Sequence, residues 1–70
     1  MKSGRWYLED GAVMTNLTKN FTYDISLILL RTPERREEWV LHMAEKSWVS
    51  PDDIIDLRAF LDNLVSMGYL

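Results

Sequence analysis

The sequence predicts a small α+β domain, in which an antiparallel three-stranded sheet within residues 5–30 is packed by two helices at about 33–46 and 51–67. Three observations support this fold class. An Asp-Gly pair lies between two short apolar segments, an alternating segment follows it, and two helix starts made of a hydroxyl residue, a proline and an acid open the second half of the chain. With 70 residues, we expect a single domain over 1–70.

Residues 5–15 are expected to form a β-hairpin, because Asp10-Gly11 is a preferred pair for the mirror-image turns that match the twist of two strands. A two-residue loop then places Leu8 opposite Val13. One face of the hairpin would carry four residues that alternate with those of the other face. These are Trp6, Leu8, Val13 and Thr15.

The segment 21–30 fits two structures. Its aromatic and aliphatic residues alternate with polar ones as in a strand, and its β-branched and aromatic content favours that interpretation. The alternation is lost at Ile28 and Leu30, which predicts that both faces are covered there and that this is the central strand of a meander. The alternative is a helix over Tyr23–Arg31, which would give a β-hairpin followed by three helices.

Two helices are predicted from their start signals, Thr32-Pro33-Glu34 and Ser50-Pro51-Asp52. A hydroxyl can cap the first turn, proline suits the first helical position, and an acid complements the helix dipole. The link at 47–49 is short, so the helices are neighbours, and Trp48 is expected to pack where they meet.

The last helix carries more apolar residues than its neighbours should hide. Ile54, Leu57, Leu61 and Leu64 recur at spacings of three and four, and further apolar residues widen this stripe beyond half of the helix circumference. We therefore expect an apolar patch to remain exposed, and such patches mark binding partners.

Composition excludes several classes of protein. The chain has no cysteine, so it forms no disulfide and no thiolate metal site, and its 47% of hydrophobic residues is too high for a disordered segment. The net charge of −3 disfavours nonspecific nucleic-acid binding. The longest aliphatic run is Leu27–Leu30, so we expect neither a secretion signal nor a membrane span, and a cytoplasmic location.

No residues form a recognisable catalytic, cofactor or metal site. His42 is the only histidine, and with Glu38 and Glu45 on one helix edge it cannot complete a tetrahedral metal site. The acids at the start of the last helix are explained by the helix dipole. The serines and glycines lie in no nucleophile or phosphate-binding motif. We therefore expect a non-enzymatic protein without a cofactor.

The leading hypothesis is a small cytosolic protein–protein interaction module, an adaptor or an inhibitor of a larger protein, of the size that phage and bacterial accessory proteins often have. It would use the acidic, apolar last helix together with two tryptophans. The predicted interface residues are Asp52, Asp56, Asp62, Leu57, Leu61, Leu64, Trp39 and Trp48.

Two further possibilities concern the same helices. A DNA-binding regulator of the helix-turn-helix type is the alternative function, although acids at the start of the second helix would repel phosphates. A homodimer could form through the seam of Ile54, Leu57, Leu61 and Leu64, whose spacing resembles a short coiled-coil stripe.

Overall fold

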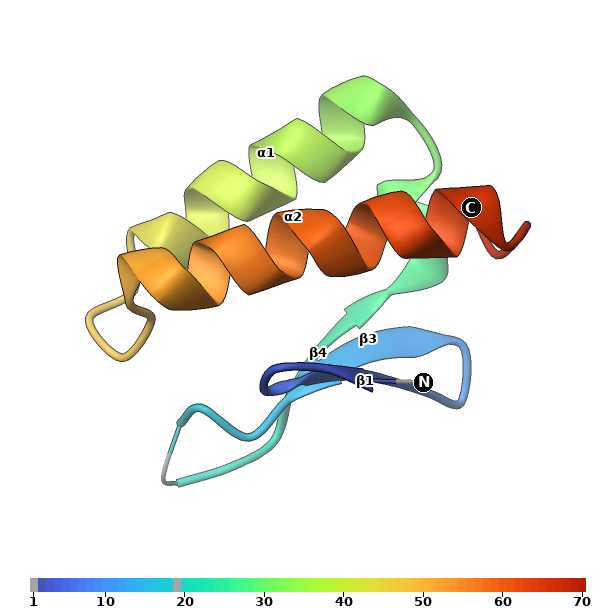
Figure 1. The fold of residues 1–70 in the computed structure, drawn as a ribbon. Coiled ribbons are helices and arrows are strands. Elements are labelled where there is room, and N and C mark those ends of the chain that lie inside the picture. Colours follow the sequence, from blue (N-terminus) through green and yellow to red (C-terminus); the bar gives the residue numbers. More distant parts are fainter. Residues whose placement is uncertain (1, 19) are drawn as a thin grey trace.

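The computed structural model describes residues 2–18 and 20–70, and it confirms the α+β fold. A sheet forms one layer, and two antiparallel helices lie on one side of it (Figure 1). The elements in chain order are β1 (Lys2–Ser3), β2 (Trp6–Glu9), β3 (Ala12–Thr15), β4 (Tyr23–Ser26), the 3₁₀ helix η1 (Leu27–Leu30), α1 (Pro33–Ala44) and α2 (Pro51–Ser66).

The sheet is an antiparallel meander in the order β1-β2-β3-β4, with three main strands and the two-residue β1 at one edge. The predicted hairpin register is confirmed, with Leu8 opposite Val13. Asp10 and Gly11 both have positive φ angles, 51° and 73°, as a mirror-image turn requires.

The predictions for residues 21–30 are correct in part. Residues 23–26 do form a strand, but β4 lies at an edge of the sheet, because β2 and β3 occupy the centre. The strand ends at Ser26, whose Oγ accepts a 3.4 Å hydrogen bond from the N–H of Ile28 as the chain turns into η1. Here Leu30 is fully buried while Ile28 is 69% exposed, so only one side of this segment is covered. The alternative helix over Tyr23–Arg31 does not form, because a strand and a 3₁₀ helix occupy these residues.

Both helices begin where the start signals place them. Thr32 Oγ1 accepts a 3.2 Å hydrogen bond from the N–H of Arg35. Ser50 and Asp53 form a reciprocal capping box, with bonds of 3.2 and 2.8 Å between each side chain and the other's backbone N–H. In the part of the chain that the structure describes, neither helix is long and apolar enough to cross a bilayer.

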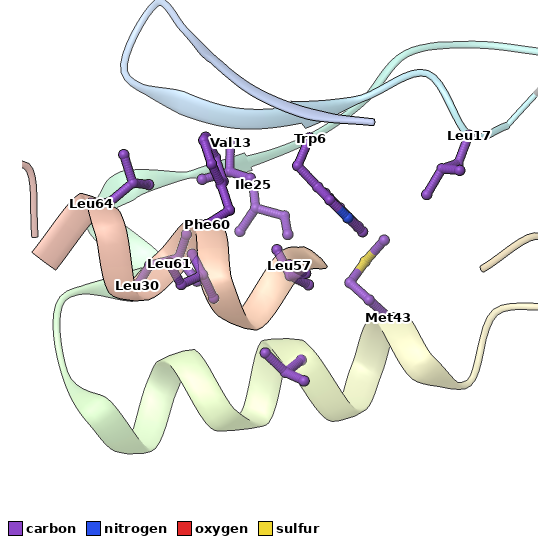
Figure 2. Packing of buried hydrophobic residues seen from close by; sticks show 11 residues of the cluster. Trp6, Val13, Leu17, Ile25, Leu30, Met43, Leu57, Phe60, Leu61 and Leu64 are labelled. Atoms are coloured by element: carbon purple, nitrogen blue, oxygen red, sulfur yellow. The ribbon is translucent and has the colours of Figure 1, made fainter. Parts of the chain in front are cut away.

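The core lies between the sheet and the helices. The α2 helix packs on β1 and β2, and α1 packs against α2 and η1. Figure 2 shows Met43 of α1 reaching toward Trp6 of β2, with Leu57 and Phe60 of α2 beside them. The chain exposes 4545 Å², close to the value of about 4,600 Å² that surface scaling gives for a folded monomer of 8.3 kDa. The chain therefore buries as much surface as is usual for a folded domain of this size.

Candidate protein-binding surface

The α2 helix has a core side and a solvent side. Its core side holds three of the predicted interface residues, Leu57, Leu61 and Leu64, which are 1%, 3% and 0% exposed. They pack with Trp6 and other buried residues of the sheet. The chain's own core therefore covers these leucines, which the sequence predicts to lie in a partner interface or a dimer seam.

The solvent side of α2 holds two other predicted interface residues, Asp52 and Asp62. Both are exposed, and Ile55 and Ala59 lie between them at positions three and seven residues beyond Asp52, so all four share one side of the helix. Ile55 is 64% exposed. The apolar excess predicted for this helix is thus present, at Ile55 and Val65 rather than at the leucines.

Asp56 lies elsewhere, on the side of α2 that faces the turn between β1 and β2. It is half-buried, and a Cβ placed on Gly4 would overlap its carboxylate. Gly4 has a φ of +58°, which favours glycine at this position. Asp56 therefore packs against the sheet, and only part of its side chain is accessible to a partner.

The α1 helix adds a second exposed stripe beside that of α2. Glu34, Glu38, Leu41 and Glu45 are spaced by four, three and four residues, so they share one side of the helix, and all are exposed. Leu41 is 56% exposed. The spacing can be read from the sequence, but the sequence does not show that this side of α1 is exposed. That follows from the burial of Val40 and Met43 on the other side.

A hollow lies where α1 ends and α2 begins. Its volume is about 350 Å³. Most of its lining is apolar, with contributions from both helices and the link between them: Ala44, Val49, Ser50, Pro51, Ile54 and Ile55. We call the hollow and the two exposed stripes together the outer face, because most of their residues are exposed to solvent, whereas the core residues of both helices are buried.

An ion pair joins the two helices along this outer face. Arg58 donates two hydrogen bonds to the carboxylate of Glu37, at 2.6 and 2.8 Å. These hydrogen bonds lower the pKa of Glu37, and desolvation opposes the shift in part. They likewise raise the pKa of Arg58. The positive charge of Arg58 is therefore already matched by a carboxylate of α1.

Acidic side chains dominate the helical part of the molecule. Residues 33–66 contain eight acidic and four basic side chains, a net charge of −4. Besides Arg58, Arg36 donates a 3.0 Å hydrogen bond to the C=O of Leu30, and Lys46 lies over the ring of Tyr23 at 5.1 Å. The remaining one, Arg35, lies on the side of α1 that carries His42, seven residues on. The outer face is consequently acidic.

Neither predicted interface tryptophan lines the hollow between the helices. Trp48 was expected between the helices, but its ring packs on Tyr23 of β4 with 5.6 Å between centroids, because Tyr23 offers an aromatic surface beside the link. Trp39 packs edge-on against His42 at 5.2 Å, and both line a second hollow with Glu38. The eight predicted residues therefore fall into separate groups rather than one surface.

Within residues 2–18 and 20–70, no three His, Asp or Glu side chains are grouped so that they could hold a metal ion. A comparison with protein-family models, with curated proteins and with solved structures found no match to this chain.

Proposed function

We propose that this protein is a non-enzymatic protein-binding module, an adaptor or an inhibitor of a larger protein, and that the outer face is its binding surface. The observation that carries the proposal is the placement of exposed Ile55 between Asp52 and Asp62, on the side of α2 opposite its core leucines. Nothing in the packing of the monomer requires an isoleucine there. An exposed apolar surface that adjoins an apolar hollow is typical of protein-binding sites.

The apolar residues of the proposed binding surface are Leu41 and Ile55, which a partner can reach, and not the buried leucines of α2. Leu41 and Ile55 are both more than half exposed. Ile55 belongs to the lining of the hollow, and Leu41 precedes Ala44, another lining residue, by three positions in α1. The two exposed stripes combine these apolar residues with exposed carboxylates, and protein interfaces likewise combine an apolar centre with a polar rim. Self-association through the seam is not part of the proposal, since the seam lies in the core.

DNA binding receives less support from the arrangement of the helices. In a helix-turn-helix the two helices cross at about 90–120° and the second enters the major groove. Here α1 and α2 lie side by side and antiparallel (Figure 1), and the first turn of α2 carries Asp52 and Asp53. Both features oppose an approach to phosphates.

A photo-crosslinking experiment tests the proposal. A photoreactive phenylalanine analogue replaces Ile55 in one version of the protein and Tyr7, on the opposite face of the sheet, in a matched control. In lysate of the cells that naturally make this protein, the Ile55 version should crosslink to a defined protein that the Tyr7 version does not capture. The adduct should survive nuclease treatment. Equal labelling from both positions, or labelling that disappears with nuclease, would overturn the proposal.

A further inference from the structure

We infer that the occupant of the outer face is a basic amphipathic helix of a partner protein, with one apolar side chain in the hollow between α1 and α2. This inference rests on the proposed function and names the chemistry of the partner at the same surface. It follows from the shape of the hollow, the position of the exposed apolar residues and the distribution of charge.

The hollow suits an apolar anchor. Its volume of about 350 Å³ is at the small end of the range of about 300–1,000 Å³ that is usual for binding pockets. The side chains of Ala44, Val49 and Ile54 offer no charge to an entering group. An aliphatic or aromatic side chain is the group that such a lining favours.

The surroundings of the hollow favour a helix rather than an isolated side chain. Leu41 lies one turn of α1 before Ala44, so apolar surface continues from the hollow along the two antiparallel helices. A helix bound in a groove presents apolar residues at spacings of three, four and seven. A bound helix could therefore place one such residue in the hollow and a second one beside the exposed Leu41.

Charge complementarity selects a basic helix. The exposed stripes carry Glu34, Glu38, Glu45, Asp52 and Asp62. Three of the four basic residues of the helical part interact within the chain, namely Arg36, Lys46 and Arg58. Lysine or arginine residues beside the apolar anchor would therefore meet unbalanced carboxylates, which raises the association rate and selects the partner.

The same charges disfavour other occupants. A second copy of this chain docked through its own outer face would bring five carboxylates against five more, and like charges in an interface are costly. The anionic surfaces of nucleic acids and of acidic lipid bilayers are repelled for the same reason. A positively charged protein segment meets none of these penalties.

Synthetic helices of opposite charge test the inference. The probe is a peptide of about 14 residues, close to four turns, in which leucine and lysine follow an amphipathic pattern. Its counterpart has glutamate in place of every lysine. We expect the leucine–lysine peptide to bind with a stoichiometry of one, with amide NMR shifts concentrated on the outer face, and the glutamate peptide to show no binding at the same concentrations.

Two matched triple variants separate a specific site from general attraction between opposite charges. Glu45→Gln, Asp52→Asn and Asp62→Asn remove three charges from the outer face, and the control Glu9→Gln, Asp10→Asn and Asp24→Asn removes three exposed charges from the sheet. The first set of substitutions should lower the affinity for the leucine–lysine peptide by about tenfold or more, which is a typical effect of removing a few interface residues. The control should leave the affinity nearly unchanged. Equal losses in both variants would overturn the inference.

The peptide experiment and the Ile55 crosslink test different claims, so failure of the basic-helix inference can be told apart from failure of the proposed function. If the Ile55 crosslink captures a partner that the leucine–lysine peptide fails to displace, the binding module stands and its basic helical occupant is wrong. If the Ile55 position captures no protein, the proposed function itself falls, whatever the peptide does.

Discussion

The indole Nε1–H of Trp6 donates a 2.8 Å hydrogen bond to the backbone C=O of Asp53, and so joins two residues that are 47 positions apart. Trp6 is almost fully buried, and Asp53 lies in the first turn of α2. The bond therefore fixes where α2 begins on the sheet. Because a helix is rigid over a few turns, this hydrogen bond also helps to determine which side of α2 faces solvent.

Replacing Trp6 by phenylalanine should destabilise the fold by about 1–3 kcal/mol, through loss of this hydrogen bond and of buried ring volume. Equilibrium unfolding in urea measures the change. Trp48→Phe is the matched control, because Trp48 is half-buried in the link between the helices, and it should cost less than Trp6→Phe. A larger loss at Trp48 would contradict this account of α2 docking.

Gly4→Ala should cost more stability than Gly11→Ala. Both glycines have positive φ, so each alanine carries a backbone penalty of about 1–2 kcal/mol. A Cβ at Gly4 would also overlap the carboxylate of Asp56, whereas a Cβ at Gly11 has no neighbour within 4 Å. Adding Asp56→Ala should restore part of the loss at Gly4 and none at Gly11. Identical behaviour of the two glycines in urea unfolding would rule out the close packing of this turn on α2.

Ser50→Ala should destabilise the protein by about 1 kcal/mol, because it removes the acceptor for the Asp53 N–H in the capping box. Ser66→Ala, at the exposed C-terminal end of the same helix, is the control and should change stability by less than about 0.5 kcal/mol. Thermal unfolding followed by circular dichroism compares them. Equal midpoints for the two variants would show that the cap contributes nothing.

The carboxylate of Glu37 should titrate below its ordinary pKa of 4.5, because Arg58 donates hydrogen bonds to the charged form. Since folding lowers this pKa, the stabilisation is fully present above the unfolded value and is lost as the pH falls through the lower folded value. NMR titration of the Glu37 side chain measures it. In Arg58→Gln the midpoint should rise, and high salt should shrink the shift in the parent protein. A midpoint that Arg58→Gln leaves unmoved would exclude the pair in solution.

Local signals in the sequence predicted the hairpin and the two helix starts well, because each depends on neighbouring residues. The turn at Asp10-Gly11 and the caps at Thr32 and Ser50 need no distant contact to be recognised. The place of residues 23–26 in the sheet could not be predicted in this way. It depends on which strands lie on either side, and among the described strands β4 pairs with β3 alone.

Which side of α2 is exposed was harder to predict than the fold, for a related reason. Periodicity shows that Leu57 and Leu61 share a side of α2, but it does not say whether a sheet or a partner covers that side. In this protein Trp6 and the other buried residues of the sheet cover it. The exposed apolar side chains of the outer face are instead Ile55, which lies outside the leucine stripe of α2, and Leu41 on the neighbouring helix.

The most direct test of the outer face is the affinity of the crosslinked partner for Ile55→Gln, measured by titration with the purified proteins. We expect this variant to lose about tenfold or more in affinity for the partner. Its unfolding free energy should stay within about 1 kcal/mol of the parent, because Ile55 is exposed. The same change on the core side, Leu61→Gln, should instead cost about 2–5 kcal/mol of stability. Unchanged partner affinity in a folded Ile55→Gln protein would contradict the assignment of the outer face as the binding surface.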